Sequence, residues 1–129
     1  MPEWRILIVD DAEEARAVLA IALRTISGAE VEVADSAERA LALMGSDQLD
    51  VLVTDMRMGG MSGLELMSVL RERGQWPSAG VLVISGESDP DLPQKARESG
   101  AAAFFTKPFS ATEVRRSVIS LLESSHGKA

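Results

Sequence analysis

Short runs of apolar residues alternate along the chain with longer stretches in which apolar residues recur every three or four positions. The short runs are rich in Val, Ile and Leu, which is typical of strands that are buried on both faces. The longer stretches have the spacing of amphipathic helices. The pattern predicts strands at residues 5–9, 31–33, 51–53, 81–84 and 102–105. It predicts helices within residues 15–26, 37–44, 64–71, 92–99 and 114–122.

The fourth predicted helix is the weakest of the five. Pro90 and Pro93 cannot stand in the interior of a helix, but both suit its first turn. We therefore expect a short helix that begins late, with Asp89 or Asp91 as its cap.

Five strand–helix pairs in strict alternation predict an α/β fold. Such a chain forms a doubly wound parallel sheet with helices on both faces, joined by right-handed crossovers. No linker, repeat or low-complexity tract interrupts the alternation. We therefore expect one domain that uses residues 1–129, a length that is ordinary for a single domain.

The composition narrows the class of protein. Among 129 residues, 20 Asp and Glu outnumber 13 Lys and Arg, which gives a formal net charge of −7. An acidic chain is poorly suited to the phosphate backbone of a nucleic acid. No apolar run approaches the roughly 20 residues of a membrane span, and no signal-peptide pattern is present. The absence of Cys excludes disulfides, Cys-ligated metals and thiol catalysis. We expect a soluble cytoplasmic protein that binds neither nucleic acid directly nor a membrane.

Polar side chains stand at the ends of four of the predicted strands. They are Asp10 and Asp11 after the first strand, Asp55 after the third, Ser85 after the fourth and Lys107 after the fifth. The carboxyl ends of parallel strands meet at one edge of a sheet, and ligands of open α/β sheets bind there. We therefore expect these side chains to lie close together.

The expected cluster favours phosphoryl transfer. Its three carboxylates repel one another unless a cation lies between them, and Mg²⁺ prefers such oxygen ligands. The absence of Cys and of any suitably placed His argues against softer metals. Lys107 supplies a point charge, and Ser85 a hydroxyl, for the oxygens of a bound anion. This set suits a reaction in which one carboxylate is the nucleophile.

In order and spacing, these residues resemble the signature of response-regulator receiver domains of two-component systems. The residues that carry the resemblance are Asp10, Asp11, Asp55, Ser85, Lys107 and Pro108. The likeness extends over about residues 4–125. It implies a flavodoxin-like sheet of five parallel strands in the order 2-1-3-4-5. It also implies a phosphorylation-activated signalling module that is not a dedicated enzyme.

The resemblance implies a role for each residue at the site. Asp55 would accept the phosphoryl group from a sensor histidine kinase or a phosphotransfer protein. Asp11 and Asp55 would bind Mg²⁺ directly, and Asp10 would bind it through water. The backbone carbonyl of Arg57 would complete the protein ligands. Lys107 would pair with the phosphoryl group.

The resemblance also implies a switch. Ser85 would turn toward the phosphoryl group and let Phe104 turn inward. This would reshape the face of the fourth helix, fifth strand and fifth helix, where a downstream protein or a second copy would bind. Pro108 would follow a cis peptide bond. Arg57 and Glu87 would border the path of attacking water and set the lifetime of the phosphoryl group. We expect a basic patch on the output face formed by Lys95, Arg97, Arg115 and Arg116.

The chain departs from the usual family pattern in three places. The family usually has Pro four residues after the phosphorylated Asp, where this chain has Gly59 followed by Gly60. Gly adds backbone freedom where Pro removes it, so we expect a less rigid loop after Asp55. The switch hydroxyl at Ser85 is Ser rather than the commoner Thr. The switch aromatic, Phe104, lacks a hydroxyl.

Other functions on the same fold agree less well with the sequence. A Mg²⁺-dependent phosphatase with an aspartyl-phosphate intermediate needs a second acid two positions after the nucleophile, where this chain has Arg57. A flavin or nucleotide carrier would have Ser, Thr and Gly after the first strand, where residues 10–14 include four acids. A degenerate receiver used only for docking would not need the full acidic set. The chain is compatible with a stand-alone receiver and with a receiver inside a longer protein.

Overall fold

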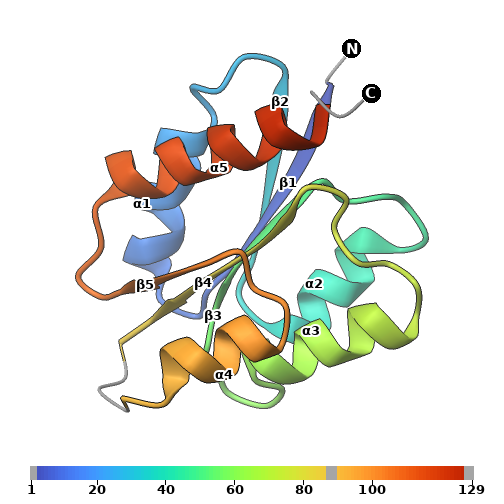
Figure 1. The fold of residues 1–129 in the computed structure, drawn as a ribbon, viewed down its shortest axis with the longest axis vertical. Coiled ribbons are helices and arrows are strands. Elements are labelled where there is room, and N and C mark those ends of the chain that lie inside the picture. Colours follow the sequence, from blue (N-terminus) through green and yellow to red (C-terminus); the bar gives the residue numbers. More distant parts are fainter. Residues whose placement is uncertain (1–2, 87–89, 127–129) are drawn as a thin grey trace.

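The structure is a computed structural model that describes residues 3–86 and 90–126 of the 129-residue chain. Five strands and five helices alternate along it, as the apolar pattern predicts (Figure 1). The strands are β1 (Trp4–Val9), β2 (Ala29–Ala34), β3 (Val51–Asp55), β4 (Gly80–Ser85) and β5 (Ala103–Thr106). The helices are α1 (Glu13–Leu23), α2 (Ala37–Met44), α3 (Gly63–Glu72), α4 (Leu92–Glu98) and α5 (Ala111–His126). Among the described helices, none combines the length and the apolar character that crossing a membrane requires.

The five strands form one parallel sheet. Their order is β2-β1-β3-β4-β5, which confirms the expected topology. After β2 the chain crosses back over β1, so that β3 lies on the other side of β1. The order of the strands reverses at this point, and the carboxyl ends of β1 and β3 therefore border the place where open α/β sheets bind ligands.

The helices cover both faces of the sheet, and each face has its own core (Figure 1). Successive side chains of a strand point to opposite faces. In β1, Ile6 and Ile8 therefore pack with α1 and α5, while Leu7 and Val9 pack with α2, α3 and α4. All four side chains are buried. Burial on both faces explains why the strands appear in the sequence as continuous apolar runs.

The first helix ends earlier than the apolar spacing predicts. That spacing continues to Ile26, but α1 ends at Leu23. The chain then forms a turn in which the Ile26 N–H donates to the Leu23 carbonyl at 3.1 Å. The turn brings Ile26 back into the core, where it is buried. The helical spacing therefore persists after the helix itself has ended.

The fourth helix is short, as expected, and has Pro93 in its first turn. Asp91 precedes it but makes no side-chain capping hydrogen bond. Asp89, the alternative cap, lies outside the described residues. The short α4 covers the sheet near β5, where Leu92 and Ala96 are its buried residues.

Candidate functional site

The structure brings the predicted polar residues together at the carboxyl ends of β1, β3 and β5. Asp10, Asp11 and Asp55 each have a carboxylate oxygen within 4.8 Å of those of the other two. Lys107 Nζ lies 2.9 Å from Asp10 Oδ2 and 3.4 Å from Asp55 Oδ2. Asp10 and Asp55 are buried, while Asp11 is exposed. The site is therefore a half-open acidic cluster with one ammonium group inside it.

Backbone hydrogen bonds fix Asp10 at the end of β1. Its N–H donates to the Ala34 carbonyl at 3.1 Å, and its Oδ1 accepts from the Ala12 N–H at 2.8 Å. Its carbonyl accepts from Arg16 Nη1 at 2.8 Å. The second carboxylate oxygen, Oδ2, is buried and has no hydrogen-bond partner. It forms an ion pair with Lys107 Nζ at 2.9 Å.

Asp55 is held between the backbone and Lys107. Its Oδ1 accepts from the Met56 N–H at 2.8 Å, and its Oδ2 accepts from Lys107 Nζ at 3.4 Å. Burial and the nearby charge of Asp10 raise the pKa of Asp55 to about 6, although Lys107 and the Met56 N–H both lower it. Near neutral pH, Asp55 is therefore mostly ionised but easier to protonate than an ordinary Asp.

Lys107 is fixed by its backbone as well as by its ion pairs. Burial lowers the pKa of Lys107, but the contacts with Asp10 and Asp55 together outweigh burial and raise it. The Lys107 N–H donates to the Ser85 carbonyl at 2.9 Å. The peptide bond between Lys107 and Pro108 is cis, the isomer that the resemblance implies. Lys107 is therefore a permanent positive charge beside the two buried carboxylates.

The chemistry of this donor set fits a hard divalent cation. When all three carboxylates are ionised, Lys107 neutralises only one of their three charges. The Oδ2 of Asp10 and the exposed carboxylate of Asp11 are oxygen donors of the kind that Mg²⁺ prefers. Arg57 stands two positions after Asp55 in the chain, and its side chain is exposed. The described residues can therefore hold a metal ion at this edge of the sheet.

The two residues that the resemblance implies as a switch lie on neighbouring strands. Ser85 is buried at the last position of β4, and Phe104 is half-buried in β5, opposite Val83. Phe104 packs at the margin of the core that α2, α3 and α4 cover. A cavity of about 40 Å³ adjoins it, lined by Pro93, Arg97 and residues 101–104.

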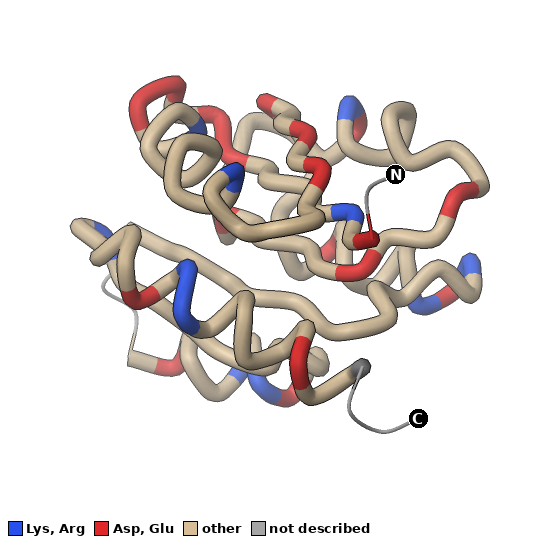
Figure 2. The backbone as a smooth tube through the Cα atoms, turned by 90° about the horizontal axis from the view of Figure 1, so that it is seen from above, with Lys and Arg blue, Asp and Glu red and all other residues tan. Residues whose placement is uncertain are grey.

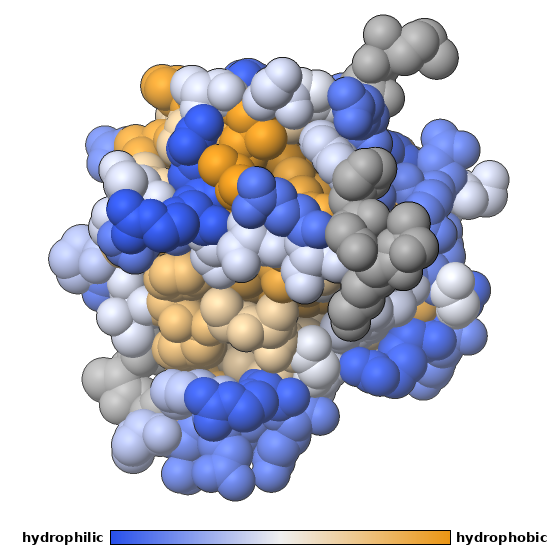
Figure 3. All heavy atoms as spheres, turned by 45° about the horizontal axis from the view of Figure 1, so that its top comes forward, coloured by the Kyte–Doolittle hydropathy of each residue, from blue (hydrophilic) through white to orange (hydrophobic). Residues whose placement is uncertain are grey.

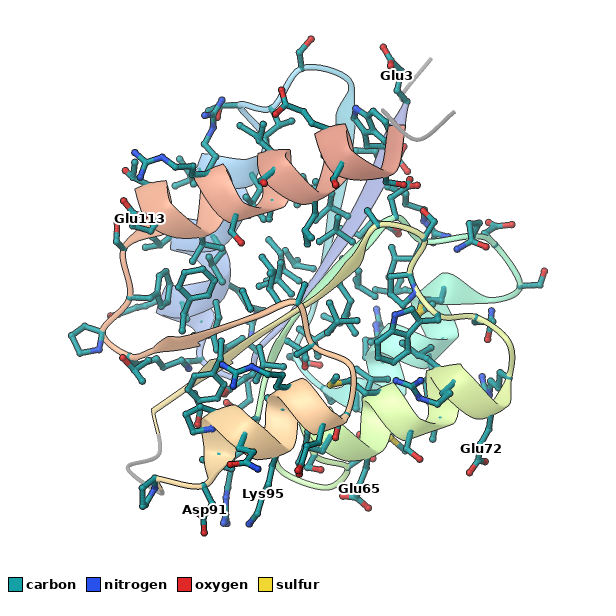
Figure 4. All side chains as sticks on the ribbon, in the orientation of Figure 1. Glu3, Glu65, Glu72, Asp91, Lys95 and Glu113 are labelled. Atoms are coloured by element: carbon teal, nitrogen blue, oxygen red, sulfur yellow. The ribbon has the colours of Figure 1, made fainter. Side chains whose placement is uncertain are left out.

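Two residues of the predicted basic patch have separate partners on α5 and beside α1. Arg115 Nε donates to Thr25 Oγ1 at 2.7 Å, so this side chain turns toward the end of α1 and away from α4. Arg116 pairs with Glu113 one turn earlier on α5, at 2.6 Å. Lys95 projects from α4 away from the sheet (Figure 4). Residues adjacent on α5 point in different directions around the helix, so Arg115 and Arg116 have different partners, and the patch as a whole stays a prediction.

Glu87 lies outside the described residues. Two residues near the site are absent from the sequence-based predictions. Glu38 of α2 accepts from the Met61 N–H at 3.2 Å, across 23 residues of sequence, and no local pattern points to that contact. Gly63 stands so close to the Asp55 carbonyl that a Cβ there would lie 2.2 Å from the oxygen. The sequence does carry one signal of this contact, because glycines at positions 59, 60 and 63 allow the backbone of the loop to approach another segment closely.

Comparison with known proteins gives one family. A family model for the response regulator receiver domain matches residues 6–119. The chain is 30% identical over 123 residues to the chemotaxis protein CheY of Pseudomonas aeruginosa. The aligned region covers 95% of this chain and 99% of that protein. It is 39% identical over 115 residues to the transcriptional regulatory protein FixJ of Rhizobium meliloti. Here the aligned region covers 88% of this chain and 54% of that protein.

Solved structures agree with these sequence matches. The N-terminal domain of an uncharacterized protein from Wolinella succinogenes has a TM-score of 0.86 at 30% identity, with 98% of this chain and 99% of that chain covered. The strand order and the acidic cluster indicate the same family as the sequence matches. The chain therefore belongs to the family of response regulator receiver domains, the phosphoacceptor domains of two-component signalling.

Proposed function

We propose that Asp55 is the residue that accepts the phosphoryl group, within one receiver domain of about residues 4–125. One observation carries the proposal: the buried Asp55 carboxylate lies beside Lys107 and close to two further carboxylates. Both oxygens of Asp10 face other groups, namely the Ala12 N–H and Lys107, and Asp10 is 1% exposed. Asp11 is exposed and is better suited to bind a metal ion than to accept the phosphoryl group.

In the proposed reaction, a carboxylate oxygen of Asp55 attacks the phosphorus atom of a phosphohistidine. An O–P bond forms and the N–P bond breaks, and the imidazole nitrogen leaves with the electron pair of that bond. The Lys107 ammonium stabilises the charge on the phosphoryl oxygens. The Met56 N–H holds the other oxygen of Asp55 and so keeps the attacking oxygen oriented.

We infer that the resident cation is Mg²⁺. Asp11 and Asp55 would bind it directly, Asp10 through water, and the backbone carbonyl of Arg57 would complete the set. When bound, the ion supplies positive charge to the phosphoryl oxygens. The oxygen-only donor set and the excess of negative charge over the single Lys107 ammonium support this choice.

The proposed phosphodonor is a sensor histidine kinase or a phosphotransfer protein in the cytoplasm, where ATP is available to the kinase. The chain would assist its own phosphorylation and dephosphorylation and would not be a dedicated enzyme. A phosphatase would need an acid two positions after Asp55 to protonate the leaving group. Arg57 stands there with an exposed guanidinium, which cannot donate a proton near neutral pH.

We place the output surface on α4, β5 and α5. A moderately apolar strip lies between these two charged helices (Figure 3). On phosphorylation, Ser85 would donate a hydrogen bond to the phosphoryl group, and Phe104 would rotate inward. A cavity of about 40 Å³ beside Phe104 supports this proposal, because it leaves space next to the ring. A downstream protein or a second copy would bind this surface.

Direct binding of nucleic acid is not part of the proposal. The basic residues of the described part of the chain are scattered among acidic ones (Figure 2). The net charge of −7 opposes contact with a phosphate backbone.

The test is the intact mass of the protein after incubation with acetyl phosphate and Mg²⁺. The wild type is expected to gain one phosphoryl unit, and Asp55→Asn is expected to gain none. Asp35→Asn is the matched control, because Asp35 follows β2 at the same edge of the sheet but is not part of the carboxylate cluster. Uptake by Asp55→Asn at the wild-type rate would overturn the assignment.

A further inference from the structure

The loop between β3 and α3 carries the proposed metal ligand Arg57 and begins directly after Asp55. Backbone hydrogen bonds hold it at both ends. The Met56 N–H donates to the Ile84 carbonyl at 3.1 Å, and the Gly63 N–H donates to the Met56 carbonyl at 2.9 Å. Between these bonds stand Gly59 and Gly60, both exposed. Glycines have the most backbone freedom to lose, so this part of the loop is the most costly to order.

A side chain from another element contacts this loop. Glu38, near the start of α2, accepts a hydrogen bond from the Met61 N–H through Oε2 at 3.2 Å. The neighbouring Gly60 has a φ of +88°. A Cβ at Gly60 would lie only 3.0 Å from the same carboxylate oxygen. The glycine therefore provides both the backbone conformation and the space that the carboxylate needs.

We propose that Glu38 is a positioning residue for the phosphorylation site. It ties the glycine-containing loop to α2 and so restricts the segment that presents Arg57 beside Asp55. In this chain, Glu38 takes over the restriction that a Pro at position 59 would supply. The proposal rests on the proposed function of Asp55, because it assigns Glu38 a role at that same site.

A purely structural role for Glu38 predicts a different result. Glu38 is an acidic residue in the first turn of α2, where its charge also favours the helix dipole. That role depends on the negative charge, whereas the hydrogen bond from Met61 needs only an acceptor oxygen. Glu38→Gln removes the charge and keeps an acceptor, so it separates the two roles.

The first experiment measures Mg²⁺ affinity by calorimetry and the amide hydrogen exchange of Met61. Glu38→Ala is expected to weaken Mg²⁺ binding by about fivefold, the effect of one typical hydrogen bond, and to speed exchange at Met61. Glu38→Gln is expected to stay within about twofold of the wild type in both. The control is Glu72→Ala, which makes the same charge change at the other end of α3, where the side chain points away from the sheet (Figure 4). Wild-type values in Glu38→Ala, or an equal loss in Glu38→Gln, would overturn the proposal.

A second variant tests whether loop freedom is the cause. Gly59 is outside the left-handed region of φ, and a Cβ there would meet nothing within 4 Å. Gly59→Pro in the Glu38→Ala background is therefore expected to recover most of the lost Mg²⁺ affinity. A double variant as weak as Glu38→Ala alone would contradict the proposal.

The two proposals can fail separately. The readouts for Glu38 need no phosphoryl transfer, so they stand whichever residue is phosphorylated. Uptake of phosphate by Asp55→Asn would overturn the role of Asp55 while leaving a measured effect of Glu38 on Mg²⁺ in place. Normal uptake at Asp55 with an unchanged Glu38→Ala variant would overturn only the role of Glu38.

Discussion

At the scale of single residues, the site concentrates negative charge where water is largely excluded. Asp10 and Asp55 are 1% and 6% exposed, and each has one oxygen bound by a backbone N–H. Lys107 contacts both of them. The carboxylates are therefore oriented before any ligand arrives, but their mutual repulsion is only partly relieved.

The raised pKa of Asp55 predicts how stability depends on pH in the absence of metal. The pKa is about 6 in the folded state and about 3.8 in the unfolded state, so the folded state binds the proton more tightly. The contribution of Asp55 to stability therefore falls as pH rises from about 4 to 6, and the cost persists above pH 6. Asp55→Asn is expected to be more stable than the wild type at pH 7 by up to about 3 kcal/mol. Urea unfolding in EDTA at pH 4.5 and pH 7 measures both variants.

The difference between the two proteins is expected to shrink at pH 4.5, where most of the Asp55 carboxyl is protonated in the folded state. This comparison cancels the titration of all other groups. An Asp55→Asn variant that is less stable than the wild type at pH 7 would contradict the burial of an unfavourable charge at this site.

Binding of Mg²⁺ is expected to relieve the repulsion and stabilise the fold. An ion that binds only the folded state raises its stability in proportion to RT ln(1 + [L]/Kd). Millimolar Mg²⁺ is therefore expected to raise the Tm of the wild type, measured by differential scanning calorimetry. The increase is expected to vanish in Asp11→Ala and to persist in Glu72→Ala. An unchanged Tm in the wild type would count against a metal site.

The lifetime of the phosphoryl group is expected to depend on Arg57 and Glu87. These residues stand two positions after Asp55 and after Ser85, respectively. If the two side chains paired across the site, an exposed ion pair would stabilise the protein by only about 0–1 kcal/mol. Arg57→Ala and Glu87→Ala are therefore expected to change the dephosphorylation rate more than the free energy of unfolding. Loss of the phosphoryl mass with time measures the rate, and equal half-lives in all three proteins would refute the idea.

At the scale of secondary-structure elements, α3 and the loop before it fix the position of the end of β3, which carries Asp55. Ser62 and Glu65 form a capping box at the start of α3, in which each side chain accepts from the other residue's N–H. The first residue of the helix, Gly63, lies against the Asp55 carbonyl. The start of α3 is thus fixed against the end of β3, which carries Asp55.

This close approach predicts a strong effect of a single methyl group. A Cβ at Gly63 would lie 2.2 Å from the Asp55 carbonyl oxygen, too close for the backbone to stay in place. Gly63→Ala is expected to destabilise the protein by about 1–3 kcal/mol and to weaken Mg²⁺ binding. Gly59→Ala is the matched control, because the space around Gly59 is open. Denaturant unfolding of both variants measures the effect, and equal stability would contradict the description of this contact.

At the scale of the whole molecule, the acidic cluster and the proposed output surface lie at different parts of the sheet. The acidic cluster lies at the carboxyl ends of the strands, and β5 forms one border of the sheet, between α4 and α5 (Figure 1). Ser85 and Phe104 stand on the adjacent strands β4 and β5, between the cluster and that surface. Burying an aromatic ring stabilises by about 1.5–3 kcal/mol relative to full exposure, which is enough to bias two arrangements of similar energy.

Beryllofluoride, which mimics a phosphoryl group on Asp55, provides the test at this scale. Its addition with Mg²⁺ is expected to change the amide chemical shifts of Phe104 and of residues in α5, as well as those of the loops around Asp55 and Lys107. Because Phe104 lacks a hydroxyl, no polar group resists the inward state, and we expect that state to be partly populated beforehand. Changes confined to the loops would show that the switch does not reach the output surface.

Several features of this protein could be predicted from its sequence alone. The alternation of strand and helix, the burial of β1 on both faces and the aspartates at the ends of β1 and β3 all follow from local patterns. Such patterns are visible within a few residues of sequence, because side chains of a helix or strand point outward with a fixed period and the apolar face must be buried. The position of Asp10, Asp11 and Asp55 at one edge follows from the parallel order of the strands.

Tertiary structure decided the features that depend on which elements come into contact. Glu38 reaches Met61 because α2 lies beside the loop after β3. Arg115 turns toward Thr25 because α5 packs beside α1, and Ile26 returns to the core through a turn beyond its helix. Oδ2 of Asp10 forms an ion pair with Lys107 because β1 and β5, which are distant in the chain, end at the same edge of the sheet. A local sequence pattern records whether a side chain is buried, whereas its partner is determined by the packing of elements that are distant in the chain.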